Sequence, residues 1–443
     1  CGGAVKLPFR DLGISPLAAR ILENRGIRTP EEARRFLFPA LSDLPDPTAM
    51  KGMEKAVARI VHALREGEKI TLFGDYDVDG TTATAVLLLF LKKAGAQVDF
   101  LLPHRLKEGY GLNGEAVMKI RASGTRLLIT ADCGISSREE ILWARDHGLD
   151  VIVTDHHEIP EDLPPALAIL NPKQKDCPYP FRELAGVGVA FNLVIALRSA
   201  LRKEGFFGKE NGPNLKEYLD LVALGTVSDV VPLTGANRIL VKFGLTELAL
   251  ARRPGIAALK EVSGMGAGPV DATGVLFRLA PRVNAAGRLD DARGAIELFT
   301  SDDPGEARRL AARLDEWNAS RQRIEERILA EARAMIPPPG RGDARRSLVL
   351  ASPDWHPGVI GIVASRLAEE FHCPTILIAL EGGRGKGSGR SIAAFPLYEG
   401  LKACRDCPMC HMTDTVAFIT GSESNTPRGR AMTLWGLEKG LLS

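Results

Sequence analysis

Three aspartates separated by single residues follow a short apolar run at residues 69–74. They are Asp75, Asp77 and Asp79, and a glycine precedes and follows the group. Because side chains alternate along extended backbone, we expect the three carboxylates to point to the same side. Carboxylates held together repel one another unless a cation neutralises them, so the spacing predicts a site for a hard divalent metal. The alternative is a solvated acidic turn, since Asp and Gly are common turn residues.

Further polar residues follow later apolar segments of the chain. These candidate ligands are Asp132 after 126–131, Asp155, His156 and His157 after 150–154, and Asp229 at the end of a helical stretch. In an open α/β sheet, ligands bind outside the carboxyl ends of the strands, so we expect these side chains to converge there. A lone Asp229 would also fit a turn that ends a helix.

Short apolar runs alternate with helical stretches in the first half of the chain, which predicts α/β architecture with a mostly parallel, doubly wound sheet. The expected strands are 69–74, 98–102, 126–131, 150–154 and 167–170. The expected helices are 81–94, opened by threonine caps, and 138–147.

The second half begins with helical patterns over 213–227 and over the long, charged stretch 304–336. The prolines from Pro337 onward must end this long helix. A smaller α/β unit is expected after that break, with a strand at 347–351, a helix at 359–371 and a strand at 375–380.

Length and composition limit the class of protein. A chain of 443 residues is long enough for two or three domains, and 45% hydrophobic with 25% charged residues is ordinary for a soluble protein. The net charge of +2 does not by itself indicate nucleic-acid binding, although a local basic groove is compatible with it. Seven cysteines do not form a disulfide scaffold, and the first residues do not resemble a secretory signal, so a cytoplasmic protein is expected.

The polar segments, taken in order, resemble the motifs of the DHH phosphoesterase family. Segments 74–80, 131–134, 155–157 and 225–232 are similar to four successive motifs of that family. Segments 281–288 and 356–366 are similar to its RecJ exonuclease branch, and the second lies in what resembles a DHHA1 domain. The similarity extends from about Leu12 to about Leu401.

The resemblance implies a centre of two Mn²⁺ or Mg²⁺ ions and a set of residues around it. The implied metal ligands are Asp77, Asp79, Asp132, His156 and Asp229, with Asp132 as the bridge. The implied catalytic neighbours are Asp75, Asp155, which would orient a neighbour, and His157, which would contact the scissile phosphate. The implied reaction is hydrolysis of phosphodiester bonds in single-stranded DNA, from the 5′ to the 3′ end, in DNA repair and recombination.

Substrate contacts are expected mainly from basic and polar residues of the RecJ-like segments. The candidates are Arg105, Asn284, Arg288, His356, Ser365, Arg366, Ser388 and Arg390. Guanidinium groups match the geometry of phosphate. The glycine-rich segment 382–391 is either a flexible loop or a backbone-binding surface, and we favour substrate binding there.

The resemblance also divides the chain into parts. These are an N-terminal helical segment (1–50), a DHH domain (51–303), a connecting helix (304–339), a DHHA1-like domain (340–403) and an atypical tail (404–443). The tail lacks the Gly-Gly-His segment of RecJ-like chains, and the usual OB-type domain is missing from this sequence. It instead carries a Cys/His cluster that has the spacing of zinc or haem-attachment sites but that we interpret as free thiols: Cys404, Cys407, Cys410 and His411.

Two other functions remain open at this stage. One is a DHH phosphoesterase acting on short oligonucleotides, cyclic dinucleotides or pyrophosphate. The other is a non-catalytic nucleic-acid-binding protein, although such relatives usually lose ligands and every motif Asp and His is present here. The partners expected from the resemblance are single-stranded DNA and a single-strand-binding protein or helicase, with no membrane and a monomeric state.

Overall fold

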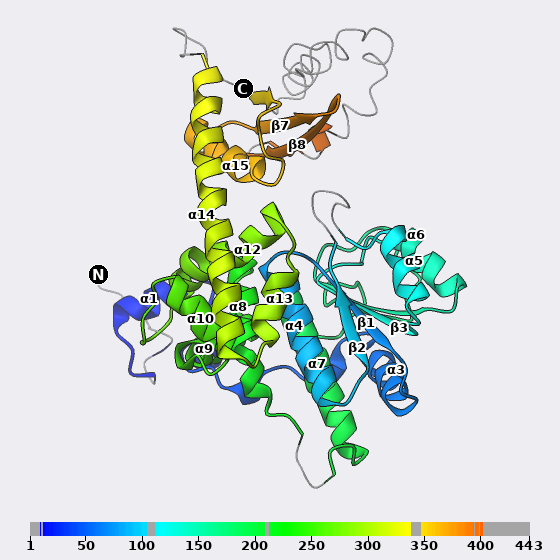
Figure 1. Cartoon of the computed structure of the whole chain (residues 1–443). Coiled ribbons are helices and arrows are strands. Elements are labelled where there is room, and N and C mark those ends of the chain that lie inside the picture. The colour runs from blue at the N-terminus through cyan, green and yellow to red at the C-terminus, as the bar shows by residue number, and fades with distance from the viewer. Residues whose placement is uncertain are drawn as a thin grey trace. The chain divides into compact units, whose positions relative to one another are not determined.

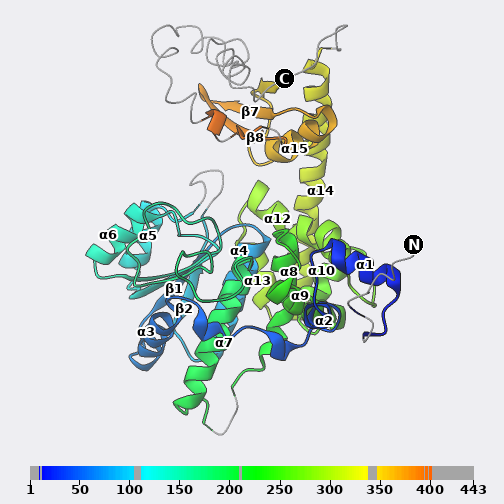
Figure 2. The ribbon, with the colours of Figure 1, turned by 180° about the vertical axis from the view of Figure 1, so that it is seen from behind.

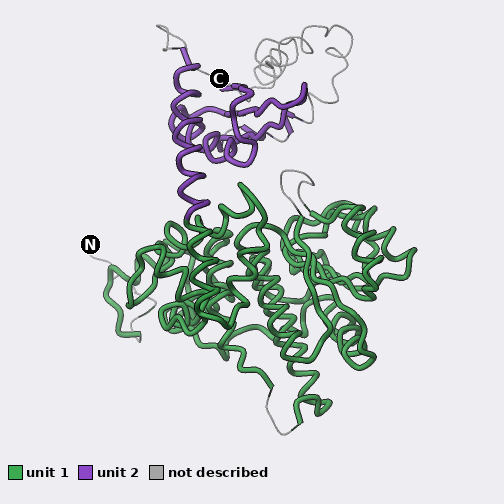
Figure 3. Tube along the Cα trace, viewed as in Figure 1, with its two compact units in different colours: residues 1–315 green, residues 316–443 purple. Residues whose placement is uncertain are grey.

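The computed structural model describes residues 9, 12–103, 111–208, 212–337, 347–393, 395–397 and 399–401. The chain forms two compact units, Cys1–Asp315 and Glu316–Ser443 (Figure 3). The division falls within the long helix α14 (Pro304–Met335), whose bounds confirm the helix expected over 304–336.

Unit 1 begins with two short helices, α1 (Pro16–Asn24) and α2 (Pro30–Leu37). Ser15 caps the first helix, and Thr29 and Glu32 form a capping box on the second. A small core that includes Phe9, Leu22 and Ala33 holds these helices together. The 3₁₀ turns η2 (Leu41–Asp43) and η3 (Pro47–Ala49) lead to the main sheet.

Five parallel strands form the main sheet in the order β2-β1-β3-β4-β5. Their bounds are β1 (Ile70–Gly74), β2 (Val98–Leu101), β3 (Leu127–Ala131), β4 (Asp150–Thr154) and β5 (Ala168–Leu170). Strands β1, β3 and β4 are buried almost throughout, as near-continuous apolar runs predict for a parallel sheet covered on both faces. All five expected strands are confirmed.

Helices cover both faces of this sheet (Figures 1 and 2). Helices α5 (Gly114–Ala122) and α6 (Arg138–Asp146) bury one face in a core that includes Phe73, Leu128 and Val153. Helices α4 (Val78–Lys93) and α7 (Gly186–Lys203) pack on the other face, and α3 (Met53–Arg65) packs against α7 and β5. The doubly wound α/β fold is therefore confirmed.

A helical region completes unit 1. Its helix α8 packs on α4. Its elements are η4 (Leu215–Tyr218), α8 (Leu219–Ser228), α9 (Gly235–Leu250), α10 (Pro254–Val262), α11 (Ala272–Gly274), the π-helical turn η5 (Val275–Leu279), α12 (Ala280–Leu289) and α13 (Arg293–Thr300). Helix α8 is buried from Leu219 to Val227, because it contacts α4, α7 and α9. The helical pattern expected over 213–227 is confirmed.

Unit 2 contains a three-stranded sheet in the order β6-β7-β8 with helix α15 packed on it. The elements are β6 (Leu348–Ser352), α15 (Ile360–Phe371), β7 (Thr375–Glu381) and β8 (Arg384–Arg390), and β8 is antiparallel to β7. The expected strand, helix and strand are confirmed. The glycine-rich segment is not a flexible loop: Gly382 and Gly383, both with positive φ, form the tight turn of a hairpin, and the remainder is strand β8.

Candidate metal centre

The register of the sheet places three carboxylates side by side. Gly74 pairs with Ala131, and Ala131 pairs with Thr154, so the next residue on each strand is an aspartate: Asp75, Asp132 and Asp155. Strand β1 is also where the strand order reverses, because β2 lies on one side of it and β3, β4 and β5 follow on the other. This topological switch point is where open α/β sheets bind ligands.

The remaining aspartates of the first motif belong to a helix terminus rather than to extended backbone. Asp77 caps α4, since its Oδ1 accepts a hydrogen bond from the Gly80 amide at 2.9 Å, and Asp79 lies in the first turn. The helix therefore begins three residues earlier than predicted. The predicted threonine cap is wrong, because the hydroxyls of Thr81, Thr82 and Thr84 donate to carbonyl oxygens one turn earlier in the helix.

His156 brings the carboxylates of distant segments to one point. Its Nε2 lies 3.2 Å from Asp132 Oδ1, 3.6 Å from Asp229 Oδ2 and 3.8 Å from Asp79 Oδ2. The histidine is buried, and neither its Nε2 nor Asp229 Oδ2 has a hydrogen-bond partner among the described residues. Nitrogen and oxygen atoms that face one another without hydrogen bonds fit a cation between them.

Three sets of potential ligands have their donor atoms within 4.8 Å of one another: Asp75, Asp77 and Asp132; Asp79, His156 and Asp229; and Asp132, His156 and His157. Asp132 belongs to the first and third sets, and His156 to the second and third. The first and second sets have no residue in common, but the third set joins them through Asp132 and His156, which fits two neighbouring ions.

The electrostatics also favour a cation. Burial and then the neighbouring carboxylates raise the pKa of Asp79 and of Asp132 well above the ordinary value. Burial and Asp77 raise the pKa of Asp229 to about 6, and burial lowers the pKa of His156 to about 4. The protein alone thus stabilises these groups in their neutral forms, and a divalent ion would stabilise the ionised carboxylates and the neutral imidazole.

Asp155 makes hydrogen bonds with its neighbours through both carboxylate oxygens. Oδ1 accepts from the amides of His156 and His157 and pairs with His157 Nδ1 at 2.7 Å, and Oδ2 accepts from the amide of Ile135. Although burial alone would raise its pKa, these hydrogen bonds hold the pKa of Asp155 below the ordinary value. The hydrogen bond with Asp155 raises the pKa of His157, whose side chain is 46% exposed. Asp155 therefore orients His157.

Sequence reasoning missed the helix terminus that supports Asp79. The amides of Gly186 and Val187, in the first turn of α7, donate to its two carboxylate oxygens at 2.6 and 2.9 Å. A Cβ atom on Gly186 would lie 2.4 Å from Asp132 Oδ1, and one on Gly225 would lie 3.0 Å from Asp79 Oδ1. Two glycines in helices thus leave room for the carboxylates. The Gly-Val-Gly sequence at the start of α7 was the available signal.

Two of the predicted substrate residues lie on α12, which borders the first motif. The side-chain oxygen of Asn284 accepts from the Val78 amide at 3.2 Å, and Arg288 follows Gly287, where a Cβ atom would lie 2.7 Å from the Tyr76 carbonyl oxygen. Asn284 therefore holds the start of α4. Arg105 lies outside the described residues.

Unit 2 brings three of its predicted residues together. Arg390 on β8 donates from Nε to Ser365 Oγ on α15 at 2.9 Å and from Nη1 to Ser388 Oγ at 3.3 Å. Arg366 forms an ion pair with Glu325 on α14 at 2.8 Å, and Glu325 is buried. His356 is half-buried, and its Nδ1 accepts from the Gly358 amide rather than from a residue of this cluster.

Comparison with known proteins identifies the family of this chain. Residues 69–226 match the DHH family, N-terminal domain. The single-stranded-DNA-specific exonuclease RecJ of Bacillus subtilis is 44% identical over 404 residues, which cover 91% of this chain and 50% of that protein. The RecJ of Escherichia coli is 44% identical over 88% of this chain and 68% of its own length. The chain belongs to the RecJ family. It spans about half the length of the Bacillus subtilis RecJ.

Solved RecJ structures share the fold. A crystal structure of exonuclease RecJ bound to manganese is 39% identical, with a TM-score of 0.70 over 82% of this chain and 87% of that one. RecJ from Thermus thermophilus in complex with Mn²⁺ is 36% identical, with a TM-score of 0.76 over 90% of this chain and 55% of that one. Manganese therefore binds relatives that share this architecture.

Two further predictions concern cysteines and membranes. Cys133 is fully buried in the core, and burial raises the pKa of its thiol. The cluster of Cys404, Cys407, Cys410 and His411 lies outside the described residues. Among the helices that the structure describes, none is long and apolar enough to cross a membrane.

Proposed function

We propose that this chain hydrolyses phosphodiester bonds in single-stranded DNA as a metal-dependent 5′ to 3′ exonuclease of DNA repair and recombination. The observation that carries the proposal is that two sets of metal ligands are joined by a third set through Asp132 and His156, at the switch point of the sheet. The proposal is supported by the RecJ relatives, whose names specify single-stranded DNA.

The proposed metal ligands are Asp77, Asp79, Asp132, His156 and Asp229, and the ions are two Mn²⁺ or Mg²⁺. Two such ions, when bound, lower the pKa of water and neutralise the phosphate during in-line displacement. Membership of Asp132 in two of the three ligand sets supports its role as the bridge. Asp75 belongs to the set of Asp77 and Asp132, so its carboxylate can also hold a metal or a bound water.

His157 is the proposed contact for the scissile phosphate. Its partly exposed ring is held through Nδ1 by Asp155, and the raised pKa favours the protonated form. A protonated imidazole can donate a hydrogen bond to a phosphate oxygen. Asp155 acts through His157, because its own hydrogen bonds with the chain occupy both of its oxygens.

The strand itself is proposed to contact Arg105, Asn284 and Arg288 in unit 1, and His356, Ser365, Arg366, Ser388 and Arg390 in unit 2. The cluster of Ser365, Ser388 and Arg390 supports this, since it presents hydroxyls and a guanidinium on one surface of α15 and β8. We further propose the division into segments given above, a cytoplasmic monomer, and a single-strand-binding protein or helicase as partner.

The test is hydrolysis of a single-stranded oligonucleotide in Mn²⁺, with chelator and with Asp132→Ala. Asp146→Ala is the matched control, because Asp146 is an exposed carboxylate on α6. We expect a 5′ label to appear directly as mononucleotide, a 3′ label to shorten gradually, and a blunt duplex to persist. A well-folded, manganese-loaded protein that leaves the single strand intact would refute the proposal.

A further inference from the structure

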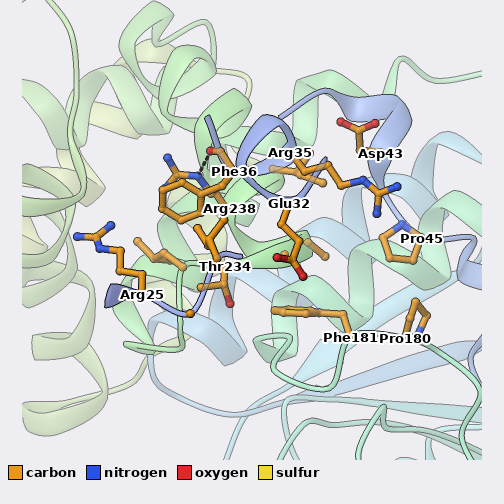
Figure 4. A pocket seen from close by; sticks show the side chains of 16 residues that line it. Arg25, Glu32, Arg35, Phe36, Asp43, Pro45, Pro180, Phe181, Thr234 and Arg238 are labelled. Atoms are coloured by element: carbon orange, nitrogen blue, oxygen red, sulfur yellow. Dashed lines mark hydrogen bonds between the residues drawn. The ribbon is translucent and has the colours of Figure 1, made fainter. Parts of the chain in front are cut away.

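A cavity of about 830 Å³ lies in unit 1 among the turn after α1, helix α2, the segment before α7 and the start of α9 (Figure 4). None of its lining residues is a proposed metal ligand. Its size is that of small-molecule sites, which typically occupy roughly 300–1,000 Å³. Its charged lining residues are Arg25, Glu32, Arg35, Asp43 and Arg238.

Two of the arginines form a positively charged group at one side of the cavity. The Arg238 guanidinium lies 3.7 Å from the centre of the Phe36 ring and donates from Nε to the Phe36 carbonyl oxygen, while Arg25 lies 5.9 Å from the same ring. Neither has a carboxylate partner among the described residues. Burial and the nearby Arg25 lower the pKa of Arg238, so the two cations repel each other. An anion here would relieve that repulsion.

The start of α9 faces the same cavity. Gly235 and Ala236 line it, and Thr234 makes no side-chain hydrogen bond to cap the helix. Amide groups in a first helical turn lack partners within the helix and favour anions. Backbone amides and guanidinium groups are both donors that bind phosphate.

The other side of the cavity suits a sugar and a base. Glu32 uses Oε2 to cap α2, and Asp43 uses Oδ2 to cap η2, while backbone hydrogen bonds lower the pKa of Glu32 and keep it ionised. Ionised carboxylates accept hydrogen bonds from hydroxyl or amino groups. Pro45, Pro180 and Phe181 add an apolar wall.

The cavity is held in shape by buried contacts. The side chain of Asn237 is fully buried and donates to the carbonyl oxygens of Glu183 and Pro232, which joins the segment before α7 to the segment before α9. Gly235 packs directly on Phe181, since a Cβ atom there would lie 2.6 Å from the ring. A cavity fixed in this way resembles a preformed ligand site.

We propose that this cavity binds a nucleotide, with its phosphate on Arg25, Arg238 and the start of α9 and its sugar and base toward Glu32 and Phe181. Charge complementarity distinguishes a nucleotide from an acidic peptide. A nucleotide carries its negative charge at one end and hydrogen-bond donors at the other, whereas an acidic peptide would bring carboxylates toward Glu32 and Asp43. Arg35 lies beside these two carboxylates, but its guanidinium already forms an ion pair with Glu31 at 3.1 Å.

The test is isothermal titration with adenosine 5′-monophosphate in excess chelator, so that the metal centre holds no ion and no hydrolysis occurs. We expect saturable binding to one site. Arg25→Ala and Arg238→Lys should each weaken it at least about tenfold, since each loses a guanidinium contact to phosphate. Arg34→Ala is the matched control, because Arg34 is an exposed arginine of α2 that does not line the cavity.

Inorganic phosphate and a hexapeptide of aspartates are the competitors. Weak competition by both supports the nucleotide site. Equal competition by phosphate, stronger competition by the peptide, absence of binding, or binding that Arg25→Ala leaves intact would each overturn it. Arg25 is exposed on the surface, so its variant tests binding without depending on the fold, and thermal melting of each variant verifies this. Because the titration involves no turnover, its result is independent of the exonuclease proposal.

Discussion

The substitution Gly186→Ala tests whether the start of α7 shapes the metal centre. An added Cβ would lie 2.4 Å from Asp132 Oδ1 and 2.7 Å from its Cβ and Cγ. Since non-bonded heavy atoms prefer about 3.5 Å, either Asp132 or the helix must move by about 1 Å. Such a shift in a reacting centre costs roughly 100-fold in rate, and overpacking costs about 1–3 kcal/mol in stability.

Gly188→Ala is the matched control in the same helix. A Cβ there would meet only Leu184, at 3.2 Å from a terminal methyl carbon that can move. Both variants gain the higher helix propensity of alanine, so propensity cannot explain a difference between them. The assays are manganese titration followed by calorimetry and the rate of oligonucleotide hydrolysis. If Gly186→Ala is folded and matches Gly188→Ala in both manganese affinity and rate, the steric argument is refuted.

Three other perturbations separate the roles of the remaining groups. Asp155→Asn should reduce the rate of hydrolysis about 10- to 100-fold, because Asp155 orients His157. The manganese affinity measured by calorimetry should change much less. A parallel loss of manganese affinity would contradict the orienting role of Asp155. Chelation should lower the melting temperature, and Mn²⁺ at about 100 times its Kd should add about 2.7 kcal/mol of stability for each ion bound, measured in denaturant titrations. Identical curves with and without metal would argue against a buried site. Glu325→Gln removes the buried carboxylate that forms an ion pair with Arg366. Binding of single-stranded DNA should therefore weaken in a filter-binding assay, without a change in manganese affinity. If DNA binding is unchanged, Arg366 does not belong to the proposed substrate surface.

The ends of the strands could be predicted from the sequence, because a buried parallel strand can be recognised from its own residues. Buried parallel strands are continuous apolar runs, and Asp75, Asp132 and Asp155 each come directly after one. Convergence of these residues then follows from the parallel order of the strands. Asp79 lies near the other carboxylates, as predicted, but the extended backbone predicted for it is wrong, since Asp79 lies in the first turn of a helix.

The features that the sequence could not predict depend on contacts between residues far apart in the chain. The amides that bind Asp79 come from α7, whose position depends on its contacts with α4 and the sheet. The sequence does not predict strand β8, because Gly and Lys have low strand propensity. It forms a strand because it pairs along its whole length with the buried strand β7.

The scattering of the proposed ligands along the chain has a consequence for biosynthesis. A nascent chain that has emerged only as far as β5 carries every proposed ligand except Asp229, which becomes available only after α8 has been made and has packed on α4 and α7. Asp79 likewise has its hydrogen-bond donors only after α7, which supplies the amides, has been made. Domains generally fold as units during synthesis, so the ion-binding geometry is completed late. Manganese uptake would therefore report that unit 1 has finished folding.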